Sequence, residues 1–211
     1  LTFGSDPNAK VTKKSKSPLS FHPIALIFGL LSFVSYLVEG AVGDWSALYL
    51  FEDKGIVIEE AVMGVMLFNG TMCIGRLLGN RLGKHLTSKQ VVVGGYLLGS
   101  IAMGLIVFLP GHASMYTYLL LGISLAMIVP NLFSAMGEQN VIPMTQAVAT
   151  STMLGYMGIL MGPALIGFIA HGTSLTVAFI VLTTLLVVSA GIGKYAYHLM
   201  SKDCGLSEEQ I

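Results

Sequence analysis

Long apolar runs separated by short polar segments dominate the sequence from about residue 23 onward. A helix needs about 20 apolar residues to cross a bilayer, and six runs are long enough. The runs are continuous, without the alternation over about 10 residues that marks a transmembrane β-barrel. The pattern therefore predicts an all-α polytopic membrane protein with six transmembrane helices. The predicted spans cover 24–50, 60–79, 90–109, 115–137, 146–170 and 174–198.

Composition agrees with this class, because 54% of the residues are hydrophobic and only 10% are charged, against about a quarter charged in soluble domains. The basic residues are unevenly distributed once the loops are assigned alternately to two sides. One side holds Lys10, Lys13, Lys14, Lys16, Arg76, Arg81, Lys84, Lys89, Lys194 and Lys202. The other side holds only Lys54. The positive-inside rule makes the lysine-rich side cytoplasmic, so we expect a multi-pass protein of the cytoplasmic (inner) membrane with both ends of this chain in the cytoplasm.

The ends of the chain are polar. Residues 1–22 are predicted to be a flexible cytoplasmic loop, 23–200 a six-helix bundle and 201–211 a cytoplasmic tail. The chain starts at Leu1 with a lysine-rich stretch and no recognisable signal peptide, which suggests a fragment whose upstream part is missing. Cys73 falls within a span and Cys204 in the tail, so no disulfide is expected.

Polar residues on one face of a membrane helix indicate the side that contacts protein or water, because the lipid-facing side must be apolar. The first span has such a stripe at Ser32, Ser35, Tyr36, Glu39, Gly43 and Ser46. The matching residues of the second span are Asn69, Cys73, Arg76 and Asn80, and those of the fourth are Ser124, Asn131, Ser134 and Glu138. The fifth span has Gln146 and Thr150 on one face and Thr152 and Tyr156 on another. We therefore expect spans one, two, four and five to surround a polar path, with spans three and six outside it.

Two local features predict how these helices are shaped and packed. Pro130 removes a backbone donor in the fourth span, which favours a kink there. Small residues four apart allow close approach of helix backbones. These pairs are Gly95 and Gly99, Gly122 and Ala126, and Gly158 and Gly162.

Glu39 is the leading candidate for function, because an ionisable group deep in a membrane span is expensive and is by default a functional residue. It is interpreted as a proton-coupling or solute-binding carboxylate. The alternatives are a carboxyl hydrogen-bonded to a neighbouring helix and one in a wide, wet vestibule near the outer surface. Its counterpart is not identified from the sequence. Asp44, nearer the outer boundary, is interpreted as structural, and so is Arg76, taken to lie at the inner end of its span.

Other polar residues on these faces are candidates for a substrate or proton pathway. They are Tyr36, Ser35, Asn69, Asn131, Tyr156 and Gln146. Asn69, Asn131 and Tyr36 are equally able to hydrogen-bond a polar solute and to join neighbouring helices. Gln146 and Tyr156 rank below them as ligands. Trp45 is interpreted as part of the aromatic belt at the outer interface, and the alternative is an aromatic at a cavity mouth that stacks on a sugar ring.

Four segments resemble the major facilitator superfamily, near its bacterial fucose-permease-like members. Residues 38–50 (VEGAVGDWSALYL) resemble the seventh helix, 129–137 (VPNLFSAMG) the tenth and 154–168 (LGYMGILMGPALIGF) the eleventh. Residues 75–85 (GRLLGNRLGKH) are similar to the loop motif between helices eight and nine. The resemblance implies the C-terminal half of a twelve-helix transporter, preceded by the central cytoplasmic loop, with the N-terminal six-helix half missing.

The loop motif departs from the pattern of the family. Asn80 stands where an aspartate is usual, and Arg76 takes the opening glycine position. A charge-based latch is therefore not expected at this loop. Arg81, Gly83 and Lys84 keep the tight basic turn, and the five residues together form the predicted conformational loop motif.

The sequence thus predicts a secondary active transporter of a small polar organic solute, with a sugar-like solute favoured and proton coupling, working by alternating access. Membrane lipid and the missing half are its expected partners, without nucleic acid, metal or cofactor. One alternative is a six-helix channel or structural membrane protein that acts as an oligomer. An intramembrane enzyme is disfavoured, because the spans contain no histidine-rich metal cluster, no paired aspartates and no Ser/His dyad.

Overall fold

The computed structural model describes residues 19, 22–82, 86–139 and 141–204. Most of the predicted leader (1–22) and of the tail (201–211) lies outside these residues, as do Gly83 and Lys84 of the loop motif. Every regular element in the described part is a helix. The helices are α1 (Pro23–Glu52), α2 (Ile58–Leu82), α3 (Ser88–Phe108), α4 (Gly111–Ala126), α5 (Ile128–Glu138), α6 (Met144–Gly172) and α7 (Leu175–Cys204).

Six helices of the described part are long and apolar enough to cross a membrane, which confirms the predicted fold class. The helices α4 and α5 together make one of them, Gly111–Glu138. The break between α4 and α5 falls at Met127, whose amide donates to Leu125. Pro130 lies one turn further on and has no amide hydrogen for the carbonyl of Ala126. The kink predicted in the fourth span is therefore confirmed, three residues before the proline.

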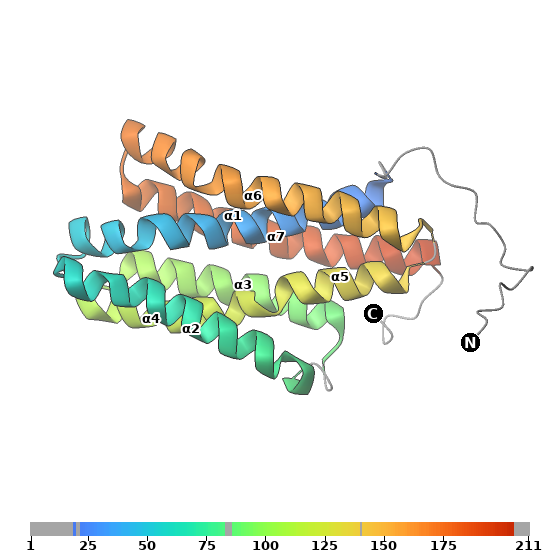
Figure 1. Cartoon of the computed structure of the whole chain (residues 1–211), viewed down its shortest axis with the longest axis horizontal. Helices are drawn as coiled ribbons and strands as arrows, with labels where there is room; N and C mark the ends of the chain where they lie inside the picture. The colour runs from blue at the N-terminus through green and yellow to red at the C-terminus, as the bar shows by residue number, and fades with distance from the viewer. Residues whose placement is uncertain (1–18, 20–21, 83–85, 140, 205–211) are drawn as a thin grey trace, which may run out of the picture.

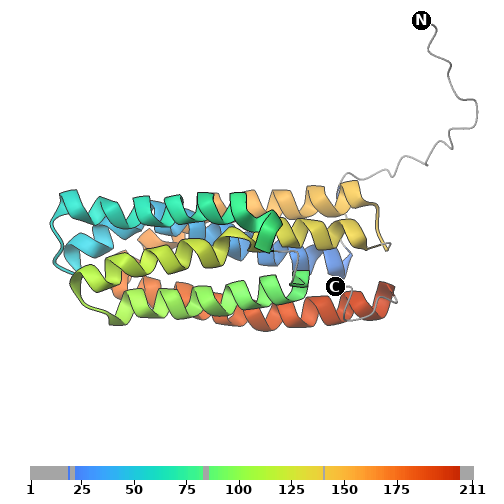
Figure 2. The ribbon, with the colours of Figure 1, turned by 90° about the horizontal axis from the view of Figure 1, so that it is seen from below.

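The helices are arranged in three layers (Figures 1 and 2). One layer holds α2 and α6, the middle layer holds α1 with α4 and α5, and the third holds α3 and α7. Within the described part of the chain, α2 and α6 pack on the middle layer and have no contact with each other. One side of α1 is therefore left uncovered between them. The helices α3 and α7, the third and sixth spans, lie on the opposite side, in agreement with the prediction.

Glycines bring α6 against α1, the most extensive helix pairing in the bundle. A Cβ atom on Gly158 would collide with the carbonyl oxygen of Phe33, and one on Gly162 with that of Leu37. A glycine also allows close contact between α3 and α4, because a Cβ on Gly95 would lie 2.8 Å from the carbonyl oxygen of Ser124. The predicted role of these small residues in close backbone contact is confirmed.

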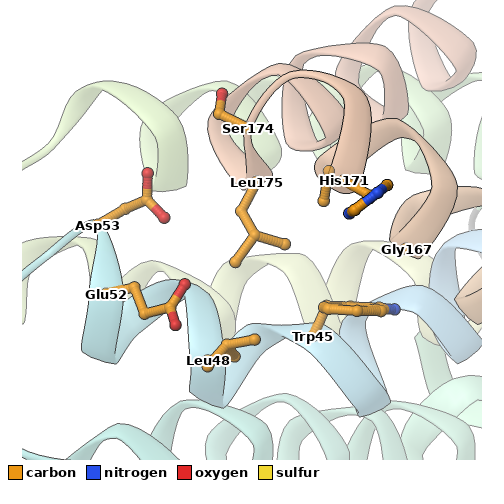
Figure 3. A pocket seen from close by; sticks show the side chains of 9 residues that line it. Trp45, Leu48, Glu52, Asp53, Gly167, His171, Ser174 and Leu175 are labelled. Atoms are coloured by element: carbon orange, nitrogen blue, oxygen red, sulfur yellow. The ribbon is translucent and has the colours of Figure 1, made fainter.

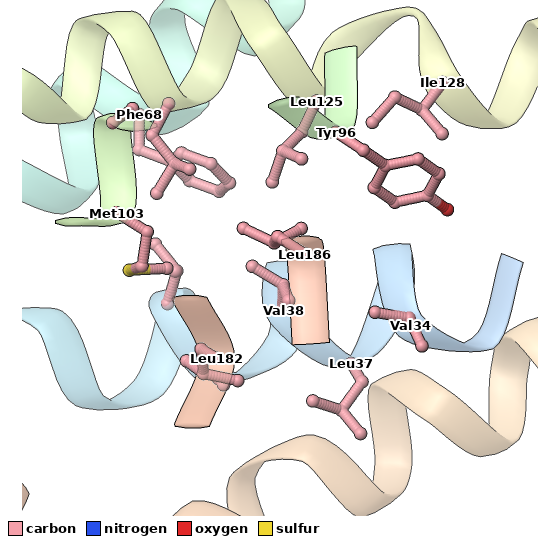
Figure 4. Close-up of a cluster of buried hydrophobic side chains, with 14 of the residues drawn as sticks. Val34, Leu37, Val38, Phe68, Tyr96, Met103, Leu125, Ile128, Leu182 and Leu186 are labelled. Atoms are coloured by element: carbon pink, nitrogen blue, oxygen red, sulfur yellow. The ribbon is translucent and has the colours of Figure 1, made fainter. Parts of the chain in front are cut away.

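A buried apolar cluster holds the layers together (Figure 4). All seven described helices contribute side chains to it, including Val38, Phe68, Met103, Leu125 and Leu186. Because lipid is as apolar as these side chains, tight packing rather than exclusion from water provides most of the stabilisation here. The position of α1 is thus set by contacts on its buried side, which leaves its other side available for polar groups.

One polar link crosses this core between α1 and α3. The Tyr96 hydroxyl donates to the Leu31 carbonyl oxygen at 2.7 Å and lies 2.8 Å from the Ser35 hydroxyl oxygen. All three groups are buried, and an unpaired polar group in an apolar interior is costly. The link therefore favours one register between α1 and α3.

Replacing Tyr96 by Phe should lower the free energy of unfolding by about 1 kcal/mol, because Ser35 loses a partner in a buried site. Thermal unfolding of the purified protein in detergent measures the effect. Tyr195→Phe is the matched control, since this tyrosine is 59% exposed. Equal midpoints for the two variants would contradict the structural role of the link.

Candidate functional site

Polar and aromatic residues run across the uncovered side of α1, from α2 to α6. Arg76 comes from α2, Glu39 and Tyr36 from α1 and Tyr156 from α6. Each is partly or fully exposed in this chain. We call these four residues the polar strip.

Glu39 and Arg76 form an ion pair at the α2 end of the strip. The Arg76 Nη2 atom lies 3.2 Å from Glu39 Oε2 and 3.4 Å from Oε1. The side chain of Glu39 is 22% exposed and that of Arg76 is 44% exposed. The pair neutralises two charges that would each be expensive alone within a membrane span.

The partner of Glu39 is what sequence reasoning missed. The sequence places Arg76 toward the inner end of a span that closes at residue 79, and the structure has the same span end at Gly79. The structure adds that Arg76 pairs with Glu39. A usable signal was present, because Arg76 shares a polar helical face with Asn69 and Cys73.

Aromatic rings occupy the α6 end of the strip. The rings of Tyr36 and Tyr156 are nearly parallel, at 8°, with centroids 6.3 Å apart. Together with Phe133, Val148 and Thr152 they line a pocket of about 310 Å³. Apolar walls with a few polar groups are typical of small-molecule sites. Pocket and ion pair share α1, one turn apart, since Tyr36 and Glu39 are three residues apart.

The predicted amide residues lie at different distances from the strip. The Asn69 side chain is exposed on α2 and donates to the Val65 carbonyl oxygen. The Asn131 side chain donates to the Met127 carbonyl oxygen at the break between α4 and α5. In both, the amide nitrogen is used within its own helix, and the side-chain oxygen is the group able to accept from a solute. Gln146 lies in the first turn of α6, about 15 Å along the helix from Tyr156.

The predicted stripe on the first span does not form one face. Ser32, Ser35 and Ser46 are buried between helices, whereas Tyr36 and Glu39 are partly exposed. Adjacent residues of a helix point about 100° apart, so Ser35 faces α3 while Tyr36 faces α6. The placement of Ser35 on a solute pathway is thus corrected, because its hydroxyl bonds Tyr96.

The predicted loop motif has four residues besides Arg76. Asn80 and Arg81 belong to α2, but their side chains are outside the described part of the structure, as are Gly83 and Lys84. Among the described residues, Arg76 alone of this motif has a defined side chain, and it faces Glu39.

A second pocket lies at the other end of α1, where α1, α6 and α7 meet (Figure 3). It measures about 530 Å³, and Trp45, Glu52 and His171 are among its lining residues. The Trp45 indole nitrogen donates to the Pro163 carbonyl oxygen at 2.9 Å. The predicted belt residue therefore also ties α1 to α6.

The short loop after α1 is fixed by polar contacts at this end. Asp53 accepts a hydrogen bond from the Thr176 hydroxyl at 2.9 Å, and Lys54 donates to the Val107 carbonyl oxygen at 2.6 Å. The Lys54 ammonium also lies over the Tyr49 ring, 5.3 Å from its centroid. Burial lowers the pKa of Lys54, and the neighbouring Asp53 carboxylate opposes that shift. These contacts hold α1, α3 and α7 together and do not reach the polar strip.

The described residues contain no group of three or more His, Cys, Asp or Glu side chains placed to hold a metal ion. The polar strip carries one carboxylate, one guanidinium and two phenol rings, which form an ion pair and a ring contact in this structure.

Known proteins of similar sequence or fold cover most of this chain. No family model matches the sequence. The chain is 41% identical over 168 residues to an uncharacterised MFS-type transporter of Yersinia pestis, covering 78% of this chain and 43% of the relative. It is 30% identical over 170 residues to the membrane protein MosC of Rhizobium meliloti, covering 79% of this chain and 42% of MosC.

Among solved structures, the fold is similar to that of the Escherichia coli fucose:proton symporter FucP, with a TM-score of 0.72 and 16% sequence identity. The match covers 83% of this chain and 43% of FucP. Fold and relatives together define a multi-pass membrane protein with relatives that are named as transporters. The chain belongs to the major facilitator superfamily. It spans about half the length of the curated relatives that it matches.

Proposed function

We propose that this chain is the C-terminal half of a twelve-helix secondary transporter of the cytoplasmic membrane, with both ends of the chain in the cytoplasm. The transporter moves a small polar organic solute by alternating access and couples this movement to protons. The observation that carries the proposal is the Glu39–Arg76 ion pair on an uncovered helix face inside a membrane span. A face of this kind needs a partner other than lipid.

The roles on the strip follow from its chemistry. Glu39 takes up and releases the proton, because its carboxyl is the ionisable acid of the strip. Arg76 pairs with the Glu39 carboxylate, and a proton on this carboxylate removes the ion pair, which gives the site two states with different contacts. Tyr36 and Tyr156 contact the solute in the adjoining pocket. Asn69 and Asn131 offer further acceptors from α2 and α5.

The missing half supplies the opposite wall. About half of each matched relative has no counterpart in this chain, and alternating access in such folds occurs by rocking of two halves around a central site. A sugar-like solute is favoured because FucP carries fucose with a proton and shares this fold. Apolar rings beside hydrogen-bonding groups suit such a molecule.

The full-length transporter, purified and reconstituted into liposomes, tests the proposal. An imposed pH gradient should drive saturable accumulation of a labelled solute found in a thermal-shift screen, and solute addition should move protons, seen with an internal pH dye. A protonophore is the control and should remove accumulation. Solute flux that does not saturate with solute concentration and does not depend on the pH gradient would favour a channel instead.

A further inference from the structure

We infer that the polar strip binds a solute carrying one negative charge, which Arg76 accepts when Glu39 has taken up a proton. The inference rests on the proposed transport function and names the class of solute, a small hydroxylated monocarboxylate such as a sugar acid. Three observations carry it: the geometry of the ion pair, the charge balance of the strip and the exposure of Arg76.

The ion pair uses only part of the arginine. Both contacts to Glu39 come from the Nη2 atom of Arg76, whereas a guanidinium group has five N–H donors in a planar fork. Within the described part of the chain, no other acceptor is hydrogen-bonded to Arg76, and its side chain is 44% exposed. The remaining donors match the two oxygens of a second carboxylate, which arginine binds in bidentate geometry.

The charge balance of the strip favours binding of an anion together with the proton. Glu39 and Arg76 sum to zero, so protonation of Glu39 leaves one positive charge within a membrane span, where an unpaired charge is expensive. The other ionisable side chains described on these faces are Tyr36 and Asp44 of α1, Cys73 of α2 and Tyr156 of α6. None is a second cation, and Asp44 points about 140° away from Glu39 around α1.

One proton and one monovalent anion therefore occupy the strip together. The proton binds to the Glu39 carboxylate, and the solute carboxylate takes the place of Glu39 on Arg76. Solute and proton then both leave on the other side of the membrane. The summed charge of the strip returns to zero when both are bound. Tyr36 and Tyr156 lie beside this position. Arg76 therefore binds the solute carboxylate, and the aromatic pocket contacts the remainder of the solute.

Cys73 provides a reporter for the inference, because it is exposed on α2 one turn from Arg76. In the full-length transporter with Cys73 as its single cysteine, labelling rates are measured for anionic 2-sulfonatoethyl and cationic 2-trimethylammonioethyl methanethiosulfonate. Glu39→Gln should raise the ratio of anionic to cationic rates by about fivefold or more, as expected for one unpaired charge nearby. Adding Arg76→Gln should return the ratio to its original value.

Asp44→Asn is the matched control, since it also neutralises one carboxylate of α1 and should change the ratio little. The inference is overturned if Glu39→Gln leaves the ratio of labelling rates unchanged. It is also overturned if the ratio stays high after Arg76→Gln is added. Labelling needs no transport, so this outcome leaves the transport function standing. In the reconstituted system, preferred uptake of glucose over glucuronate likewise overturns the anion inference and supports transport.

Discussion

Glu39→Gln in the full-length transporter should lower pH-driven accumulation of solute by about tenfold or more, which corresponds to about 1.4 kcal/mol of lost coupling. Exchange of labelled for unlabelled solute should continue. The reason is that glutamine resembles protonated glutamate in shape and has no proton to release, so the site stays in its protonated-like state. Liposomes with and without an imposed pH gradient separate the two activities.

Asp44→Asn serves as the control for this experiment, because it removes another exposed carboxylate from the same helix. It should keep accumulation near the unmodified level. If Glu39→Gln retained full pH-driven accumulation, Glu39 would have no role in coupling, and its pairing with Arg76 would be purely structural. If exchange were lost together with accumulation, Glu39 would instead be needed for solute binding.

Gly158→Ala should lower the free energy of unfolding by about 1–3 kcal/mol, the usual cost of overpacking a tight interface. The added methyl group collides with the carbonyl oxygen of Phe33, which belongs to the backbone of α1 and cannot move alone. The helices α1 and α6 must then separate. A lower unfolding midpoint of the purified transporter in detergent, and loss of the Tyr36–Tyr156 pocket geometry, would report this separation.

Gly43→Ala is the matched control, because a Cβ atom on Gly43 meets nothing within 4 Å. Since alanine favours a helix over glycine by up to about 1 kcal/mol, this variant should be neutral or slightly more stable. A destabilisation of equal size in both variants would show that helix propensity or local solvation, and not the contact between α1 and α6, decides the result.

Much of the architecture was predictable because the bilayer restricts it. A membrane span must be a continuous apolar run that pairs its own backbone groups, so six helices followed from the apolar pattern. Proline has no amide hydrogen, so the break in the fourth span was also predictable. Small residues four apart indicated close helix contacts, although not which helices they join.

The candidate site was predictable in composition and not in geometry. Glu39, Tyr36 and Tyr156 stood out because polar groups in a span need a reason to be there. Ser35 was placed with them because a stripe of polar residues on a helix covers a wide arc. Its burial against Tyr96 depends on where α3 lies, and the sequence of α1 contains no information on that position.

The sequence by itself determined the class of protein, since apolar length, charge asymmetry and local backbone chemistry act within single segments. Tertiary structure alone decided that Arg76 is the partner of Glu39, because the two residues are 37 positions apart in the sequence and the packing of α2 against α1 brings them together. It also decided which side of α1 stays uncovered. Both outcomes depend on packing between helices that are distant in sequence. This packing brings the opposite charges of Glu39 and Arg76 together on the polar strip.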